Sequence, residues 1–396
     1  MKILILTKKV PFPLTDGEVI AIHNLSIGLV NQGCEVHLLA LNTQKHYVKY
    51  DAAIPELKHF KSVRTVDIDT RVKLWPALRS YISKRSYNIH RFVSEEFKRS
   101  LRTMLSSTDF DIVQLETLYL APYISTIRKH SKAHIALRSH NVESLIWQNL
   151  AQRHKGLKGW YLQHCSDMLK QYENEVQGQY DMLLPITDLD AKYFRSRGER
   201  TPIKVVSVGL DLDKYELRPN SHKAYRLGFI GSLDWQPNLE GIDWFLTNVW
   251  ARLKNDDRDI EFHIAGRNMP YSIKNLDYPD VTVYGEVDSA VAFMNSMDLI
   301  LVPLFSGSGV RVKILEAMAL GKIVLSTPKG YEGIGVTDKV NALVFNTAAD
   351  LIQKLQELKE LDSESLSEAA RALIKQDFST TALSRDLMEF YEEAIS

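Results

Sequence analysis

Short apolar runs alternate with segments of helical periodicity along most of this chain. The runs have the length of buried strands, and the segments between them have the spacing of amphipathic helices. In the N-terminal half the expected strands cover residues 2–6, 35–41, 111–115, 134–137 and 181–186. A proline-containing loop follows the first strand and leads into an expected helix that continues to Asn31 and ends at Gly33.

The second half repeats this pattern. The expected strands there cover residues 226–230, 261–265, 299–304 and 323–326. Glycine follows the first two at once, as Gly231 and Gly266. A helix-forming run from Lys313 to Leu320 follows the third, and Gly321 stands where a helix C-cap is favoured. Repeated strand–helix units predict an α/β fold with parallel sheets and right-handed crossovers.

The length of the chain indicates its domain organisation. A chain of 396 residues suits two domains of about 200 residues each. We expect an N-terminal Rossmann-like domain over residues 1–200, a C-terminal one over 201–378, and a helix over 379–396 that returns to the N-terminal domain. Two such domains would face each other across a cleft, and ligands would bind at the carboxyl ends of the strands.

Composition excludes several classes of protein. Apolar residues make up 45% and charged residues 25%, as in ordinary globular proteins, and a net charge of zero gives no whole-chain attraction to nucleic acid. The two cysteines, Cys34 and Cys165, fit no metal-binding or redox spacing, which indicates a reducing compartment. The apolar N-terminus is too short for a signal peptide, and no run reaches the roughly 18 residues of a membrane span. We expect a cytoplasmic protein.

The segment from Asp298 to Pro328 gives the strongest functional indication, because a strand leads through a glycine loop into a helix. A helix N-terminus carries roughly half a positive charge and free N–H groups, and so favours anions. Arg311 and Lys313 in the first turn predict a ligand with more negative charge than the helix end neutralises, such as a pyrophosphate. Many such joints bind nothing. Val312 also replaces the third glycine of a dinucleotide-binding motif, which weakens any inference of hydride transfer.

These residues resemble the GT-B-fold retaining glycosyltransferases of family 4, the glycogen-synthase-like group, over nearly the whole chain. That family carries two glutamates separated by seven residues at this joint, and Glu316 matches the second. The resemblance implies that Glu316 binds the ribose hydroxyls of a donor nucleotide. Ser308 stands where the first glutamate, which contacts the hexose, is expected. The backbone of Gly309 and Val310, with that of the next two residues, would approach the sugar and phosphates.

A subgroup of the family resembles the chain more specifically, because it pairs a W-x-P-N motif with a G-S-G-x-R-x-K motif. Here the first motif is Trp235 to Asn238, after Gly231, and the second runs from Gly307 to Lys313. In that pattern Arg311 and Lys313 supply the charge that neutralises the pyrophosphate, and Arg267 assists them.

In the N-terminal half the resemblance implies that His140 lies close to the transferred sugar, which makes it the first candidate for the reaction centre. From the residues alone, a histidine that caps a helix or packs in the core is the more common role. Gly17 would let the backbone approach the phosphates or the acceptor, although a glycine before a helix is also ordinary. Asp16 and Glu143 are further candidates for handling the acceptor hydroxyl.

The implied activity is transfer of a hexose-type sugar from a nucleoside diphosphate to a hydroxyl of a glycan or lipid-linked acceptor, in surface polysaccharide or glycolipid synthesis. The family needs no metal and no cofactor, since the leaving phosphate takes the acceptor proton. Three Asp-x-Asp matches, which would indicate a metal-dependent transferase, lack the expected context after a strand. Two alternatives stay open: a non-catalytic GT-B partner subunit, and a nucleotide-sugar epimerase or phosphorylase on the same fold.

A basic segment from Arg71 to Arg102 has nine Lys or Arg residues and two Glu, interleaved with aromatic and aliphatic side chains. This composition fits contact with an anionic membrane surface, which would place the protein at the inner face of the membrane. It fits equally well a solvated helical face beside an acceptor site. Both interpretations stay open.

Overall fold

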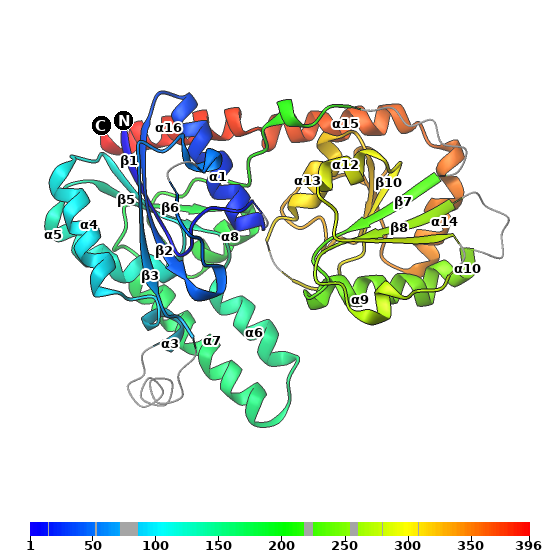
Figure 1. The fold of residues 1–396 in the computed structure, drawn as a ribbon, viewed down its shortest axis with the longest axis horizontal. Coiled ribbons are helices and arrows are strands. Elements are labelled where there is room, and N and C mark those ends of the chain that lie inside the picture. Colours follow the sequence, from blue (N-terminus) through cyan, green and yellow to red (C-terminus); the bar gives the residue numbers. More distant parts are fainter. Residues whose placement is uncertain are drawn as a thin grey trace. The chain divides into compact units, whose positions relative to one another are not determined.

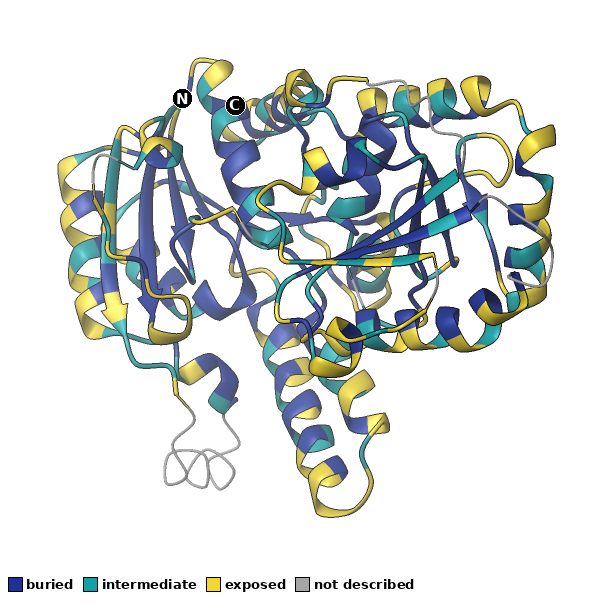
Figure 2. Cartoon of the chain, turned by 45° about the vertical axis from the view of Figure 1, so that its right-hand side comes forward, coloured by how far each residue is buried: buried dark blue, intermediate teal, exposed yellow. Residues whose placement is uncertain are grey.

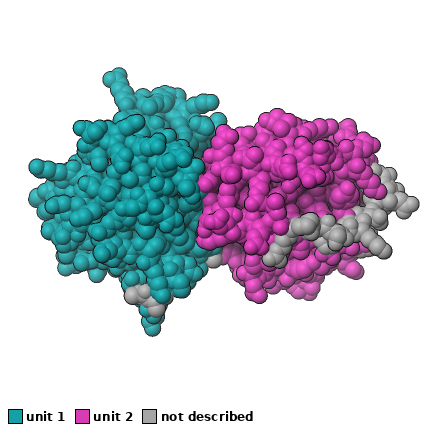
Figure 3. All heavy atoms as spheres, turned by 90° about the horizontal axis from the view of Figure 1, so that it is seen from above, with its two compact units in different colours: residues 1–209, 380–396 teal, residues 210–379 magenta. Residues whose placement is uncertain are grey.

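The computed structural model describes residues 1–14, 16–51, 54–71, 86–217, 225–253, 260–278, 280–307 and 309–396. Within these ranges the chain divides into two compact units, which Figure 3 colours separately. Unit 1 contains residues 1–209 and 380–396, and unit 2 contains residues 210–379. The division therefore falls after Gly209, nine residues beyond the boundary expected at 200.

Unit 1 is built on a parallel sheet of six strands in the order β3-β2-β1-β4-β5-β6 (Figure 1). Its strands are β1 Lys2–Thr7, β2 Glu35–Thr43, β3 Ser62–Ile68, β4 Ile112–Leu115, β5 His134–Ser139 and β6 Met182–Pro185. Both faces of the sheet are covered, because alternate residues of β1 enter different cores. Leu4 and Leu6 pack with Phe97, whereas Ile3 and Ile5 pack in a separate cluster.

The helices of unit 1 include one segment from the far end of the chain. They are α1 Gly17–Asn31, α3 Tyr87–His90, α4 Glu95–Ser107, α5 Ile124–His130, α6 Glu143–Gln152, α7 Gly156–Val176, α8 Asp188–Ser196 and α16 Thr380–Ile395. The C-terminal helix α16 packs against α1. Gly28 permits this approach, since an added Cβ would lie 2.8 Å from the side chains of Thr380 and Ser384.

Helices α6 and α7 pack against each other as a hairpin that extends away from the sheet of unit 1 (Figure 1). Exposed residues gather around its turn (Figure 2). They include Leu157, which is 88% exposed, and Trp160, which is 58% exposed. Helix α3 packs against α7.

Unit 2 contains a second parallel six-stranded sheet, in the order β12-β11-β10-β7-β8-β9. Its strands are β7 Tyr225–Ile230, β8 Ile260–Ala265, β9 Val281–Gly285, β10 Leu299–Val302, β11 Ile323–Ser326 and β12 Leu343–Val344. Its helices are α9 Gln236–Phe245, α10 Ala251–Leu253, α11 Tyr271–Lys274, α12 Ala290–Asn295, α13 Val312–Ala319, α14 Ala348–Gln356 and α15 Ser363–Asp377.

The two sheets share one topology. When each is numbered from its own first strand, both read 3-2-1-4-5-6, which is the doubly wound Rossmann order. The strand order reverses between β1 and β4 in unit 1, and between β7 and β10 in unit 2. Ligands in such folds bind at the carboxyl ends of the strands beside this reversal, so the topology marks one candidate position in each unit.

The expected α/β fold with parallel sheets is confirmed, and the strands named from the sequence are present. Three strands were missed: β3, β9 and β12. All three are at or near a sheet edge, where polar side chains interrupt the apolar run, as the mixed burial of β3 and β9 shows. Several strand boundaries differ from the expected ones by one or two residues. The strand expected to reach residue 304 ends at Val302, before Pro303, which has no N–H for the sheet.

Candidate functional site

In unit 2 the carboxyl ends of β7 and β8 come together through two glycines. Gly231 follows β7, and its N–H donates to the carbonyl of Ala265 at the end of β8 at 3.2 Å. Gly266 lies so close to this loop that an added Cβ would overlap the carbonyl oxygen of Gly231. Next to Gly266, the carbonyl of Arg267 accepts a hydrogen bond of 2.9 Å from the N–H of Leu233. Gly231 and Arg267, both expected at the donor site, therefore belong to adjoining loops.

The two sequence motifs of unit 2 meet residue by residue at the start of α13. The guanidinium of Arg311, at the N-cap, lies 5.3 Å from the ring centroid of Trp235. The ammonium of Lys313 donates to Asn238 Oδ1 at 3.1 Å and to the carbonyl of Ile230 at 2.9 Å. The first and last residues of the W-x-P-N motif thus hold the two cations of the G-S-G-x-R-x-K motif.

Removal from water makes the charged form of both cations less favourable. It lowers the pKa of Lys313 to about 7, and the positive charge of Arg311 adds to this effect. It also lowers the pKa of Arg311 to about 10, although the charge of Glu332 opposes the change. A bound anion would reverse both shifts, so the arrangement favours a negatively charged ligand.

Glu316 lies one turn further along α13. Its carboxylate accepts a hydrogen bond of 3.0 Å from the hydroxyl of Tyr215. Burial raises the pKa of Glu316 to about 7, although the Tyr215 hydrogen bond opposes the rise. The helix ends at Ala319, and Gly321, just after the C-cap Leu320, has the φ of 69° expected of a glycine after a helix C-terminus.

Two glycines shape the loop before α13. Gly307 has a φ of 104° and Gly309 a φ of 81°, which are conformations that other residues rarely adopt. An added Cβ at Gly307 would lie 2.9 Å from the Trp235 ring, so this loop is packed on the W-x-P-N motif. Val310 follows and is partly buried. Ser308, at the position of the family's first glutamate, lies outside the described residues.

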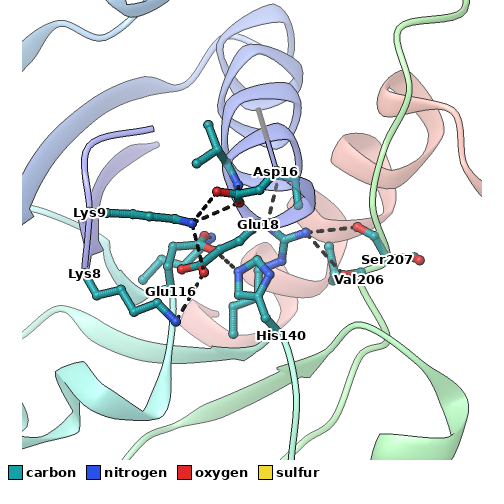
Figure 4. Close-up of polar contacts among 12 residues, drawn as sticks. Lys8, Lys9, Asp16, Glu18, Glu116, His140, Val206 and Ser207 are labelled. Atoms are coloured by element: carbon teal, nitrogen blue, oxygen red, sulfur yellow. Dashed lines mark hydrogen bonds and ion pairs between the residues drawn. The ribbon is translucent and has the colours of Figure 1, made fainter. Parts of the chain in front are cut away.

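In unit 1 the candidate site lies at the carboxyl ends of β4 and β5, beside the strand reversal (Figure 4). His140, just after β5, forms a hydrogen bond of 2.7 Å through Nε2 with the Oε2 of Glu116, just after β4. Arg138, at the end of β5, lies 3.4 Å from the same oxygen. Glu116 and Arg138 are both fully buried. His140 is buried too, so the three form one internal charge network.

The hydrogen bond with Glu116 determines which ring nitrogen of His140 carries a proton. Burial would raise the pKa of Glu116, but the charge of Arg138 and the hydrogen bond with His140 hold it below its usual value. An ionised carboxylate only accepts hydrogen bonds, so Nε2 of His140 carries a proton. In the neutral ring Nδ1 is then left as the acceptor.

Arg138 and Glu116 also connect the site to distant elements of unit 1. The guanidinium of Arg138 donates to the carbonyls of Ala21 in α1, Val206 and Ser207, at 3.3, 3.4 and 3.0 Å. On the other side, Gln114 of β4 donates to Glu116, and the hydroxyl of Tyr391 in α16 donates to Gln114 at 2.6 Å. A continuous chain of buried hydrogen bonds therefore joins α16 to His140.

The loop after β1 adds a second charge cluster next to this network (Figure 4). Lys9 donates to both carboxylate oxygens of Asp16, at 2.9 and 2.7 Å, and Asp16 also caps α1 by accepting from the N–H of Val19. Lys8 pairs with Glu18 at 3.2 Å. Asp16 is thus engaged as a helix cap and ion-pair partner, and Gly17 is the first residue of α1.

Glu143, at the start of α6, is buried and accepts a hydrogen bond of 2.8 Å from the hydroxyl of Tyr119. Burial raises the pKa of Glu143, and the positive charge of Lys8 opposes the rise. Burial lowers the pKa of Lys8, but the carboxylates of Glu18 and Glu143 outweigh it and raise the pKa overall. Glu143 therefore belongs electrostatically to the same cluster.

Sequence reasoning found His140 but missed Glu116, Arg138 and the pair Lys8–Glu18. The indication was present in the pattern, because Glu116 directly follows a buried strand and Arg138 lies inside one. A charged residue in a buried strand requires a partner of opposite charge. Which partner the charged residue finds depends on the order of the strands in the sheet, and this order cannot be read from the sequence.

Comparison with known proteins shows which family and which folds this chain resembles. Residues 224–360 match the family model described as "Glycosyl transferases group 1". A Klebsiella pneumoniae protein named "Uncharacterized 44.6 kDa protein in cps region" is 25% identical over 258 residues, which is 62% of this chain. The match spans 64% of the length of that relative.

Two solved structures share the fold over the whole chain. Sucrose-phosphate synthase from Thermosynechococcus elongatus superimposes with a TM-score of 0.72 and 13% identity, over 99% of both chains. HepE from Anabaena, in complex with UDP-glucose, superimposes with a TM-score of 0.65 and 14% identity, over 99% of this chain and 100% of that one. The fold is therefore GT-B, the two-domain glycosyltransferase architecture. With the family match, this supports a sugar-transferring function.

Two features are absent from the described residues. No group of three or more His, Cys, Asp or Glu residues in these ranges has the arrangement to hold a metal ion. Within the same ranges, no helix combines the length and the apolar character that crossing a membrane requires.

The low pKa of Lys313 predicts how stability depends on pH. In the folded protein Lys313 titrates near 7, and in the unfolded chain near 10.5, so between these values the unfolded state binds more protons. Stability from this group therefore rises with pH, by at most about 1.4 kcal/mol per pH unit. Relative to Lys313→Met, the wild-type free energy of unfolding should rise between pH 8 and 10, where Glu316 is already ionised.

Urea unfolding at several pH values measures this difference. Lys359→Met, at an exposed lysine of the same unit, is the matched control and should show no such trend against wild type. Equal pH dependence of wild type and Lys313→Met would contradict the buried position of the ammonium.

Proposed function

We propose that this chain is a retaining glycosyltransferase that moves a hexose-type sugar from a nucleoside diphosphate to a hydroxyl of a glycan or lipid-linked acceptor. The observation that carries the proposal is the start of α13, inside the segment that matches the glycosyl transferase family. There Lys313 and Glu316 both have pKa values displaced to about 7 by burial. Such shifts are unfavourable without a ligand and are typical of binding and catalytic sites.

Each candidate donor-site residue of unit 2 has a role in this proposal. Glu316 accepts hydrogen bonds from the ribose hydroxyls of the donor, as the resemblance implies. Arg311 and Lys313 neutralise the diphosphate, where a guanidinium gives bidentate contacts and an ammonium a point charge. The backbone at Gly309 and Val310 donates N–H groups to the sugar and phosphates. Gly231, Arg267 and Ser308 complete the donor site.

In this proposal unit 1 binds the acceptor. The acceptor hydroxyl attacks the anomeric carbon while the bond from that carbon to the leaving phosphate breaks, and the phosphate takes the hydroxyl proton. The sugar keeps its configuration because attack and departure use one face. His140, oriented by Glu116, would contact the transferred sugar, and Gly17, Asp16 and Glu143 would position the acceptor. Stabilising the charge on the leaving diphosphate is the main requirement of such a reaction.

The cps region named for the K. pneumoniae relative favours a role in surface polysaccharide or glycolipid synthesis. The complex of HepE with UDP-glucose favours a nucleoside-diphosphate sugar as the donor. A non-catalytic partner subunit would also keep a nucleotide site, so turnover must be measured separately from binding.

Two substitutions test the proposed division of roles. Glu316→Ala should weaken binding of the nucleoside diphosphate by about 1.5–3 kcal/mol, roughly ten- to 150-fold, because it removes a buried charged acceptor. His140→Ala should leave that affinity unchanged and lower turnover by about 10²-fold. Calorimetric titration and a sugar-transfer assay measure the two effects.

Glu364→Ala, at an exposed glutamate of unit 2, is the control and should change neither quantity. Equal nucleotide affinity in wild type and Glu316→Ala would refute the donor assignment. Nucleotide binding without transfer to any acceptor would favour the partner-subunit alternative.

We propose that the reaction needs no metal ion and no other cofactor, because Arg311 and Lys313 provide the charge that a divalent cation provides elsewhere. Turnover should therefore be the same in excess EDTA and in added Mg²⁺ or Mn²⁺. Activity that is lost in EDTA and recovered with either metal would contradict the proposal.

We further propose a cytoplasmic protein that contacts the inner face of the membrane. Support comes from the basic segment Arg71–Arg102, of which residues 72–85 lie outside the described ranges, and from the turn between α6 and α7. Helix α3 of the basic segment packs against α7. Residues 144–166 contain three Lys or Arg residues and no Asp or Glu. With the exposed Leu157 and Trp160, this turn has the composition of an interfacial anchor.

Vesicles that contain an anionic lipid test this contact. The double variant Leu157→Ser/Trp160→Ser should bind them at least about tenfold more weakly than wild type, since it removes two large apolar side chains. Leu189→Ser/Tyr271→Ser removes an exposed pair elsewhere and is the matched control. Sedimentation with vesicles measures binding, and equal loss in both double variants would argue against this anchor.

A further inference from the structure

Unit 1 contains a cavity of about 450 Å³ at the carboxyl ends of β1, β2 and β3. This volume is in the range of small-molecule binding sites. Its basic lining residues are Lys8, Lys9, Lys45, His46, Arg71 and Arg91. Among the described residues that line it, Glu18 is the single carboxylate.

Three of these cations are already paired with carboxylates. The pairs are Lys8–Glu18 at 3.2 Å, Lys9–Asp16 at 2.7 Å and Arg71–Asp69 at 3.0 Å. Lys45 and Arg91 form no ion pair with any carboxylate in the described part of the chain. The cavity therefore keeps an excess of positive charge, which Lys45 and Arg91 provide.

Arg91 is held in an orientation suited to an oxyanion. Its guanidinium carbon lies 5.2 Å from the ring centroid of Phe92, the apolar residue of the lining. Its Nε is buried and has no hydrogen-bond partner within the described ranges. A planar guanidinium that lies over an aromatic ring and lines the cavity is oriented for contact with phosphate oxygens.

The charged groups around His46 also indicate that the cavity favours an anion. Burial lowers the pKa of His46, and the positive charges of Lys9 and Lys45 lower it further, although the carboxylates of Asp16 and Glu18 oppose the change. At this position the two lysines therefore outweigh the two carboxylates, which favours an anion over another cation.

The cavity also adjoins the residues proposed to handle the acceptor. The ammonium of Lys8 lies 5.1 Å from the ring centroid of Tyr119, and the hydroxyl of Tyr119 donates to Glu143. Glu18, in the same wall, interacts electrostatically with His140. A molecule in the cavity would therefore lie beside the candidate reaction centre of unit 1.

We propose that this cavity binds the phosphate group of a phosphorylated acceptor, through the guanidinium of Arg91 and the ammonium of Lys45. A phosphate offers several oxygens and up to two negative charges, which match two cations better than one carboxylate does. This inference rests on the proposed glycosyltransferase function and names the chemical class of its acceptor.

Calorimetric titration tests whether the acceptor is phosphorylated, with the donor site first filled by a nucleoside diphosphate. The wild-type protein should bind glucose 6-phosphate more tightly than it binds glucuronate or glucose. Lys45→Gln/Arg91→Gln should bind glucose 6-phosphate at least about tenfold more weakly, because two charge-assisted hydrogen bonds are lost. Lys49→Gln/Lys58→Gln removes the same charge from exposed lysines outside the cavity and should bind as wild type does.

Arg91→Lys keeps the charge but not the bidentate geometry, and should bind with intermediate affinity. Equal affinity of the two double variants would overturn the proposal, as would tighter binding of glucuronate than of the phosphate.

A second measurement distinguishes two sources of the phosphate. Vesicles that contain phosphatidic acid present it on a lipid, and glucose 6-phosphate presents it in solution. Loss of vesicle binding in Lys45→Gln/Arg91→Gln, beyond that of the control, supports a lipid-linked acceptor. Loss of glucose 6-phosphate binding alone supports a soluble one. Loss of neither overturns the assignment.

Thermal shifts with a nucleoside diphosphate distinguish failure of this inference from failure of the proposed glycosyltransferase function. All variants should retain the wild-type shift, which also shows that they are folded. If wild type shows no shift with any diphosphate, the glycosyltransferase proposal fails. If the shift is present but the phosphate probe does not respond to the substitutions, only the cavity assignment fails.

Discussion

The buried ion pair between Arg138 and Glu116 is the interaction on which unit 1 depends. A guanidinium without exposure to water must find acceptors, and Arg138 takes them from α1, from the end of β4 and from the segment Val206–Ser207. Loss of one partner would leave an uncompensated buried charge, which typically destabilises by about 3–5 kcal/mol. The same pair holds His140 in place, so stability and the candidate chemistry share one network.

The buried Lys313 and Glu316 of unit 2 differ from the ion pair of unit 1 in the charge of their partners. Lys313 and Glu316 are kept where their charged forms are disfavoured, and the partners they have are neutral: Asn238, a backbone carbonyl and Tyr215. In the proposed donor site, a bound nucleoside diphosphate would supply the charged partner that Lys313 lacks among the described residues. A site of this kind sacrifices stability in the free protein for affinity, because its groups are positioned before the ligand binds.

Both sites follow from one topological rule applied twice. Each sheet has the same strand order, and in each the candidate residues lie just past the carboxyl ends of the strands beside the reversal. Crossover helices leave on opposite sides at that point, so the loops separate and side chains and helix ends become accessible. In unit 1 the cationic cavity lies at this edge of the sheet, with the buried His140 just after β5, and in unit 2 the start of α13 lies there.

The sequence by itself determined the alternation of strands and helices, the parallel sheets and the loop before α13, because apolar periodicity and glycine placement are local properties. It also indicated Arg311, Lys313 and Glu316 as candidate donor-binding residues, which lie within six residues of one another. Only the tertiary structure decided that Glu116 pairs with His140, and that Trp235 and Asn238 hold the cations of α13. Those pairings join residues distant along the chain, and strand order and packing select them.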